Sequence, residues 1–186
     1  MQNMVGFWMR PENLPGFIGG LLASLTIMVG PLFSAYEFSD TSFAISVVQG
    51  ADWNCVSDMK RDGSGLLEFS GRGLEVVVFY GSSPKLRTSE GAVRAFLEEA
   101  GNQIDSLKVI SADTITLWGM GAYQATYAGF AEDTSRVGRI YSLVQGERFV
   151  TLIFVKKGAK TLSDKDEYSI SEFIRGIEVK IKRDGG

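Results

Sequence analysis

The first strong feature of the hydrophobic pattern is an uncharged run of 24 residues from Asn13 to Tyr36, which contains "LPGFIGGLLASLTIMVGPLFSAY". A helix of roughly 20 apolar residues spans the hydrocarbon core of a bilayer. We therefore predict a single transmembrane helix over residues 14–36, with residues 1–13 as a short cytoplasmic N-terminus. The alternative is a cleaved export signal, although such signals usually have a shorter apolar region and end in a small-x-small site. Bulky Phe33, two residues before Ala35, makes a poor site of that kind.

Glycines and flanking charges add detail to this span. Gly16 and Gly20 have the spacing at which two membrane helices approach closely, so we predict that they contact another membrane helix. The competing interpretation is that glycine is simply frequent in membrane helices. Arg10 precedes the run and Glu37 follows it. By the positive-inside tendency, this places the N-terminus in the cytoplasm and the C-terminal domain in the periplasm or lumen.

After a polar linker over residues 37–42, one domain is expected over residues 43–186. Its first half contains short runs rich in β-branched and aromatic residues, which predict strands: "FAISVV", "LLEF" and "LEVVVFY". The period then changes over residues 88–104, where apolar residues recur every three or four positions. Thr88 or Ser89 can cap the start of this segment, so it is predicted to be a helix with one buried face.

The second half of the domain predicts longer strands. "SLKVISADTITLW", "GAYQATYAGF", "GRIYSLVQG" and "ERFVTLIFVKK" follow one another with short connections, and Gln145-Gly146 predicts a tight turn between the last two. Strands joined in this way are antiparallel. A second helix is expected from about Ser163, with Ile170, Phe173, Ile174 and Ile177 buried, before a short last strand. The fold class is therefore α+β.

Composition excludes several classes of function. The net charge is −3 and no run of Lys and Arg occurs, so nucleic acid is not expected as a partner. The chain has no His, which removes the usual catalytic base and metal ligand. A single cysteine, Cys55, forms neither an intramolecular disulfide nor a zinc site. We expect no enzyme activity, no catalytic residue, no cofactor and no metal, with a hydrolase using paired carboxylates as the minor alternative.

Three local patterns have a functional and a structural interpretation, and in each case we favour the structural one. "GMGAYQ" at 119–124 resembles part of a dinucleotide fingerprint but precedes a strand, so a bent strand is expected. A turn at Asp58, Asp62, Gly63 and Ser64 is a solvated turn rather than a cation site. The third pattern is a group of aromatic residues expected to pack in the core or on a sheet face rather than line a pocket, namely Tyr123, Tyr127, Phe130 and Tyr141.

The order of these elements resembles the PsbP-like superfamily, which includes the DcrB-type bacterial envelope proteins. The resemblance rests on "ISVVQGADW", "TSEGAVRAFL", "ITLWGMGAYQATYAGF" and "GRIYSLVQGERFVTLIFV", and covers roughly residues 43–181. It implies an antiparallel sheet with helices on both faces, an α/β/α sandwich. It also implies a non-enzymatic role, as in the extrinsic subunit that supports the oxygen-evolving site of photosystem II or in exported lipoproteins.

Two functional hypotheses follow. The favoured one is a non-catalytic, single-span accessory subunit of a larger membrane complex, and a photosynthetic complex is the specific candidate. Its partners are other subunits of that complex and the lipid bilayer, which it meets through residues 14–36. The alternative is a free exported envelope protein that binds a small ligand or lipid and whose N-terminus is a cleaved signal.

Overall fold

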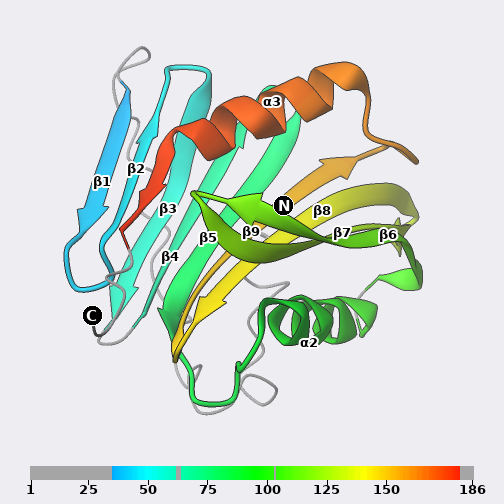
Figure 1. Cartoon of the computed structure of the whole chain (residues 1–186). Coiled ribbons are helices and arrows are strands. Elements are labelled where there is room, and N and C mark those ends of the chain that lie inside the picture. Colours follow the sequence, from blue (N-terminus) through cyan, green and yellow to red (C-terminus); the bar gives the residue numbers. More distant parts are fainter. Residues whose placement is uncertain (1–34, 62–63, 103, 181–186) are drawn as a thin grey trace.

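A large antiparallel sheet forms the centre of the part of the chain that the computed structural model describes, residues 35–61, 64–102 and 104–180 (Figure 1). Among these residues the sheet has seven strands in the order β3-β4-β5-β9-β8-β7-β6. Their bounds are β3 (Trp53–Arg61), β4 (Ser64–Gly71), β5 (Leu74–Ser82), β6 (Asp105–Leu117), β7 (Met120–Ala131), β8 (Thr134–Gln145) and β9 (Arg148–Lys157). Six of these strands, β4 to β9, were expected from the sequence and are confirmed, whereas β3 was not expected.

A smaller sheet of three described strands, β1-β2-β10, lies beside the large one (Figure 1). Its strands are β1 (Tyr36–Asp40), β2 (Ile45–Gln49) and β10 (Ile177–Val179), and both outer strands are antiparallel to β2. Residues 37–40, which we expected to be part of a linker, instead belong to β1. These residues are mostly polar, but every second side chain of β1 turns inward. Phe38 packs near the ring of Tyr80, and Asp40 is buried.

Two helices are described, and both begin where the sequence predicts. Helix α2 (Ser89–Gly101) starts after Thr88, whose hydroxyl accepts a hydrogen bond from the Gly91 amide at 3.0 Å. Helix α3 (Asp164–Arg175) starts after Ser163, which forms a reciprocal capping box with Asp166. Ile177 is buried, as predicted, but it does not belong to the helix: α3 ends at Arg175, and Ile177 is the first residue of β10.

The two faces of the large sheet bury separate cores. Val76 and Val78 belong to a core shared with α3 and the small sheet, whereas Val77 between them belongs to a core shared with α2. Since successive residues of a strand point to opposite faces, the two cores lie on opposite sides of the sheet. Figure 1 shows α3 above the strands and α2 below them. The predicted antiparallel sheet with helices on both faces is confirmed for the described residues.

Two-residue turns close the long hairpins. Between β6 and β7 the turn residues are Trp118 (φ 50°) and Gly119 (φ 76°). Between β8 and β9 the loop residues are Gly146 (φ 62°) and Glu147, so the expected turn lies one residue further along. "GMGAYQ" is therefore the end of a hairpin turn followed by a strand, and the bend that we expected within the strand is this turn.

The predicted membrane span lies almost wholly outside the described residues, as do Gly16 and Gly20. Only its last two positions are described, and Tyr36 is the first residue of β1. No helix within residues 35–61, 64–102 and 104–180 is long and apolar enough to cross a membrane.

Candidate functional site

A row of polar side chains crosses the large sheet on the face that α2 occupies. Its members come from five neighbouring strands, one from each of β4, β5, β9, β8 and β7. In that order they are Glu68, Glu75, Lys157, Arg136 and Tyr127, and we call them the polar row. The row places two acids at one end and two bases towards the other, inside a sheet whose strands are otherwise largely apolar.

Strand alternation fixes the side on which the polar row lies. Glu68 stands between Leu67 and Phe69, which both point into the core beneath α3, so its own side chain points to the α2 face. Tyr127 belongs directly to the core beneath α2. Arg136 and Lys157 are register partners on β8 and β9, which places them side by side.

Glu68 is the most unusual member of the polar row. The residue is only 5% exposed, and its Oε1 atom has no hydrogen-bond partner among the described residues. Burial, and then the nearby charge of Glu75, raise the pKa of Glu68 to about 7. The carboxyl group therefore holds its proton to near neutral pH, so it can act as a hydrogen-bond donor there.

Glu75 connects the acidic end of the row to the basic end. Its Oε1 atom pairs with Lys157 Nζ at 2.5 Å, whereas its Oε2 atom is buried with no hydrogen-bond partner in the described part of the chain. Further along, Arg136 Nη2 lies 3.4 Å from Glu132 Oε2. The row thus contains carboxyl oxygen atoms that can still accept a hydrogen bond. They lie near Lys157 and Arg136, whose positive charges balance the negative charge of the acidic members.

Tyr127 ends the row, and its position depends on a glycine. Its side chain is fully buried, and its hydroxyl has no partner among the residues described. Burial raises the pKa of this hydroxyl, although the charge of Arg136 opposes the shift. Gly138 lies opposite on β8, and a Cβ atom there would approach the Tyr127 ring to 2.4 Å. Only glycine leaves space for the ring at this position.

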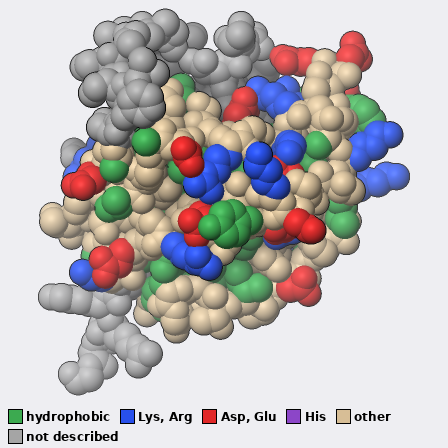
Figure 2. Space-filling model, turned by 90° about the horizontal axis from the view of Figure 1, so that it is seen from above, with side chains coloured by type: hydrophobic (Ala, Val, Ile, Leu, Met, Phe, Trp, Pro, Cys, Tyr) green, Lys and Arg blue, Asp and Glu red, His purple; other side chains and the backbone are tan. Residues whose placement is uncertain are grey.

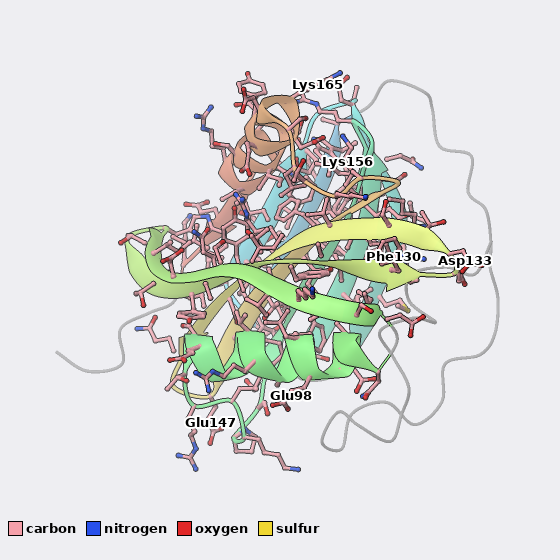
Figure 3. The ribbon with its side chains drawn as sticks, turned by 90° about the vertical axis from the view of Figure 1, so that its right-hand side faces the viewer. Glu98, Phe130, Asp133, Glu147, Lys156 and Lys165 are labelled. Carbon is pink, nitrogen blue, oxygen red and sulfur yellow. The ribbon has the colours of Figure 1, made fainter. Side chains whose placement is uncertain are left out.

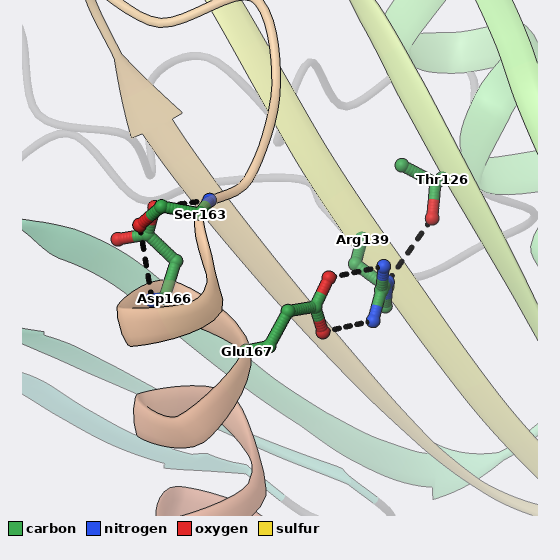
Figure 4. Close-up of polar contacts among 5 residues, drawn as sticks. All are labelled: Thr126, Arg139, Ser163, Asp166 and Glu167. Atoms are coloured by element: carbon green, nitrogen blue, oxygen red, sulfur yellow. Dashed lines mark hydrogen bonds and ion pairs between the residues drawn. The ribbon is translucent and has the colours of Figure 1, made fainter.

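The other face carries ion pairs that hold α3 on the sheet (Figure 4). Arg139 of β8 binds both carboxylate oxygens of Glu167 and also donates from Nε to the hydroxyl of Thr126 at 3.0 Å. Lys156 of β9 lies 2.6 Å from Asp166, the capping residue of α3. Figure 2 shows basic and acidic side chains interspersed over this side of the molecule, without a field of one sign.

A third polar group fixes the small sheet to the large one. Asp40 of β1 is fully buried, and it accepts hydrogen bonds from Ser42 and from the Tyr80 hydroxyl. Lys60 Nζ lies 2.9 Å from Asp40 Oδ2, the oxygen that also accepts from Tyr80. Burial works to raise its pKa, but the hydrogen bonds from Ser42 and Lys60 outweigh this and lower the pKa of Asp40 to about 2. Because all its contacts are within the domain, we assign this group a structural role.

The aromatic residues singled out in the sequence do not share a pocket. Tyr127 belongs to the core beneath α2, whereas Tyr141 belongs to the core beneath α3. Tyr123 packs at the margin of the first of these, and Phe130 is 47% exposed at one end of β7 (Figure 3). The prediction of core or sheet-face packing is confirmed, since Tyr127 and Tyr141 lie in the two cores and Phe130 lies on a strand of the sheet, outside both cores.

Of the residues expected in a solvated turn, Asp58 lies in β3 and Ser64 in β4, while Asp62 and Gly63 lie outside the described residues. Asp58 accepts a hydrogen bond from the Tyr36 hydroxyl at 2.8 Å, and Ser64 is buried in β4. No group of three or more acidic, His or Cys side chains suited to holding a metal occurs within the described ranges. Cys55 is half-buried, and burial raises the pKa of its thiol.

The polar row was not predicted from the sequence, because its members are far apart along the chain. The signal that could have found part of it is the presence of Glu68 inside the apolar run "LLEF", since a charged residue within a buried strand needs an explanation. Sequence alone does not show that Glu75 and Lys157 lie next to it. Strand order supplies that information.

Comparisons with known proteins identify the fold. No family model matches the chain, and no curated protein matches its sequence. The solution structure of cyanobacterial PsbP (CyanoP) from Synechocystis sp. PCC 6803 is similar, with a TM-score of 0.59 and 18% identity, over 87% of this chain and 100% of that one. A crystal structure of a protein from Bacteroides thetaiotaomicron VPI-5482 is also similar, with a TM-score of 0.51 and 15% identity. The match covers 78% of this chain and about half (48%) of that one. The described domain has a PsbP-like fold.

Proposed function

We propose that this chain is a non-catalytic accessory subunit of a larger membrane complex, held at the outer face of the membrane by a span over residues 14–36. The PsbP-like fold supports this role, because the resemblance to that superfamily implies accessory proteins without a reaction of their own. The similarity to cyanobacterial PsbP extends over the full length of that protein. A photosynthetic complex is the specific form of the proposal.

The observation that carries the proposal is the position of Tyr36. This residue is both the last residue of the uncharged run and the first residue of β1. Its ring packs edge-on against Phe69 with centroids 5.1 Å apart, and its hydroxyl donates to Asp58. Because Tyr36 already belongs to β1, a membrane span in this run would end just before Tyr36 and would leave almost no linker to the domain. The domain would lie directly on the membrane surface, where it can cover the outer face of neighbouring subunits.

A free exported protein that binds a small ligand or lipid is the second proposal, and the polar row favours it. Buried oxygen atoms without partners, as in Glu68 and Tyr127, are uncommon in folded proteins and call for a physical reason. A bound polar molecule would supply the missing hydrogen bonds. In that case the N-terminal run would be removed, and the mature chain would begin close to Tyr36.

One experiment separates the two proposals. The full chain, carrying a C-terminal affinity tag, is expressed in its own cells, and the membranes are washed with carbonate and then solubilised in mild detergent. The accessory subunit should stay with the washed membranes, keep its intact N-terminal mass and copurify with integral membrane proteins in fixed ratio. A soluble protein that starts near Tyr36 and copurifies with no other protein would contradict the accessory role and support the ligand-binding one.

A further inference from the structure

The outermost strand of the large sheet, β6, offers an unusually open edge. It is 13 residues long, and nearly all its side chains are exposed on both faces. Val109 is 49% exposed and Ile110 is 58% exposed, the latter among the most exposed large apolar residues in the described part of the chain. In Figure 3, β6 is the green strand at the front, and no described element lies before it. Its outer edge can therefore pair with another strand.

A bulge in β6 brings two opposite charges onto the same face. Lys108, Ser111 and Asp113 lie opposite Ala128, Thr126 and Gln124, which are alternate residues of β7. The register shifts between Val109 and Ser111, so Ile110 is the extra residue. Without this residue, Lys108 and Asp113 would point to opposite sides of the sheet. With it, they lie on one side, and the point between Ile110 and Ser111, which we call the centre, is midway between them along the chain.

The hairpin with β7 shows which backbone groups of β6 point outward. A two-residue turn joins Leu117 to Met120, and such a turn is closed by a hydrogen-bonded pair. Alternate residues from Leu117 back to Ser111 therefore direct their N–H and C=O groups to β7, and Ala112 directs its own outward. Lys108 lies opposite Ala128, which belongs to the same alternate set of β7 residues as the partners of Ser111 to Leu117. The backbone groups of Lys108 therefore also point to β7, and those of Val109 point outward. Val109 and Ala112 are thus equivalent about the centre.

We propose that β6 pairs antiparallel with β6 of a second copy of this chain, about a two-fold axis that passes between Ile110 and Ser111. In this register Val109 of each copy forms backbone hydrogen bonds with Ala112 of the other. Lys108 of each copy then lies opposite Asp113 of the other, in a pair that is not hydrogen bonded and so brings side chains closest. Two copies of the large sheet become one continuous sheet.

Charge complementarity identifies a second copy as the occupant. One strand carries both members of the ion pair, at positions that a two-fold axis exchanges, so the edge is complementary to itself. The apolar side chains of Val109 and Ile110 lie at the centre of the contact and lose solvent exposure. Charges and bulges often protect edges from pairing with other chains. Here the same features select one register, since every other antiparallel register leaves Lys108 and Asp113 without each other.

Native mass spectrometry of the full chain in mild detergent, over a series of concentrations, tests the proposal. The unaltered chain should form dimers. Lys108→Glu and Asp113→Lys should each weaken dimerisation about tenfold, because each places two like-charged pairs across the contact. The double variant Lys108→Glu/Asp113→Lys should restore it, since the pairs are exchanged. Ala112→Pro should also weaken it by removing an outward N–H group.

A matched control comes from β10, where Glu178 and Lys180 form an exposed ion pair at 3.1 Å. Glu178→Lys makes the same change of charge away from β6 and should leave dimerisation unchanged. A chain that is monomeric at every concentration overturns the proposal. The proposal is also overturned if neither single charge reversal weakens the dimer, or if the double variant does not restore it. A monomer whose β6 edge is covered only in a complex with other proteins would also overturn the proposal. The partner strand would then come from a different protein. The dimer does not depend on membrane attachment or on the proposed accessory role.

Discussion

Arg139 of β8 and Glu167 of α3 form a two-pronged ion pair, with Nη1 2.5 Å from Oε2 and Nη2 2.6 Å from Oε1. The side chains are 20% and 38% exposed, so the pair is partly screened from water (Figure 4). Bidentate pairs of this kind fix geometry as well as contributing energy. Because Arg139 also reaches Thr126 of β7, this contact sets how the first turn of α3 lies on the sheet.

We expect Glu167→Gln to lower the free energy of unfolding by about 1–2 kcal/mol, since Arg139 then keeps only part of its hydrogen bonding. Urea unfolding followed by tryptophan fluorescence measures this. The control is Glu172→Gln on the same helix, whose partner Arg175 is 71% exposed, and whose loss should cost less than about 0.5 kcal/mol. Equal effects of the two substitutions would show that the Arg139 pair does not hold the helix.

Glu68 predicts a dependence of stability on pH. Its pKa is about 7 in the folded protein, against an ordinary value of 4.5. Because the folded state binds the proton more tightly, the associated stability is complete below about pH 4.5 and is lost as the pH rises to about 7. At 1.4 kcal/mol per pH unit, the loss is at most about 3.5 kcal/mol. Urea unfolding at intervals between pH 4 and pH 8 measures it.

Glu68→Gln is the control for this titration. It removes the ionisable group while keeping the size of the side chain, so its stability should stay flat over the same range and exceed that of the unaltered chain at pH 8. Asp40 contributes in a different window, because its pKa is lowered to about 2 and its stabilisation is lost only below about pH 4. Parallel pH profiles for Glu68→Gln and the unaltered chain would show that Glu68 does not hold a proton in the fold.

The helical faces give a third prediction, which compares the two cores. Phe173 of α3 is fully buried, with ring centroids 4.8 Å from Trp53 and 5.2 Å from Phe69. Phe96 of α2 is 8% exposed and lies 6.0 Å from Phe79. Replacing either with Ala should cost about 3–5 kcal/mol, with Phe173→Ala the larger loss because it is packed on more sides.

Tyr168→Ala is the matched control for these substitutions, because this aromatic side chain on α3 is 59% exposed. Its loss should change the free energy of unfolding by less than about 0.5 kcal/mol. Equilibrium unfolding in urea measures all three variants. A loss at Phe96 or Phe173 as small as the one at Tyr168 would mean that the corresponding helix does not cover the sheet as described.

These elements also show why the sequence predicted the fold well. The period of α2, with Val93, Phe96 and Ala100 buried, follows from local geometry, and so do the strands whose residues alternate. Short connections then force antiparallel neighbours. The sequence missed β1 because "EFSD" is mostly polar, and its place is fixed by pairing with β2 and by burial of Asp40, both contacts with distant residues.

The candidate site was harder to predict for the same reason. Glu68, Lys157 and Arg136 come together only through the strand order β4-β5-β9-β8, in which β9 joins β5 far from it in sequence. No local pattern specifies such an order. The bulge at Ile110 is also invisible in the sequence, although it decides that Lys108 and Asp113 share a face.

The last prediction tests the proposed membrane span through Gly16 and Gly20. Lipid offers no hydrophobic drive for helices to associate, so close packing at small residues and weak hydrogen bonds must hold them together. Replacing both residues with Leu keeps the span apolar but blocks close approach. If the span docks against a helix of the complex, this double variant should remain in carbonate-washed membranes while its recovery with partner proteins falls about tenfold. Copurification in mild detergent, quantified by mass spectrometry, measures the loss.

Ile18 and Leu22 provide the matched control, because they have the same four-residue spacing but lie two positions further along, about 200° around a helix of 3.6 residues per turn. Changing these two to Phe adds bulk on the opposite side of the helix, and partner recovery should fall much less. Deleting residues 14–34 should release the protein from the membrane altogether while leaving β1 intact. Full recovery of partners with Gly16→Leu/Gly20→Leu, or equal losses in both pairs, would show that this spacing is not the contact and that the extrinsic domain alone recognises the complex.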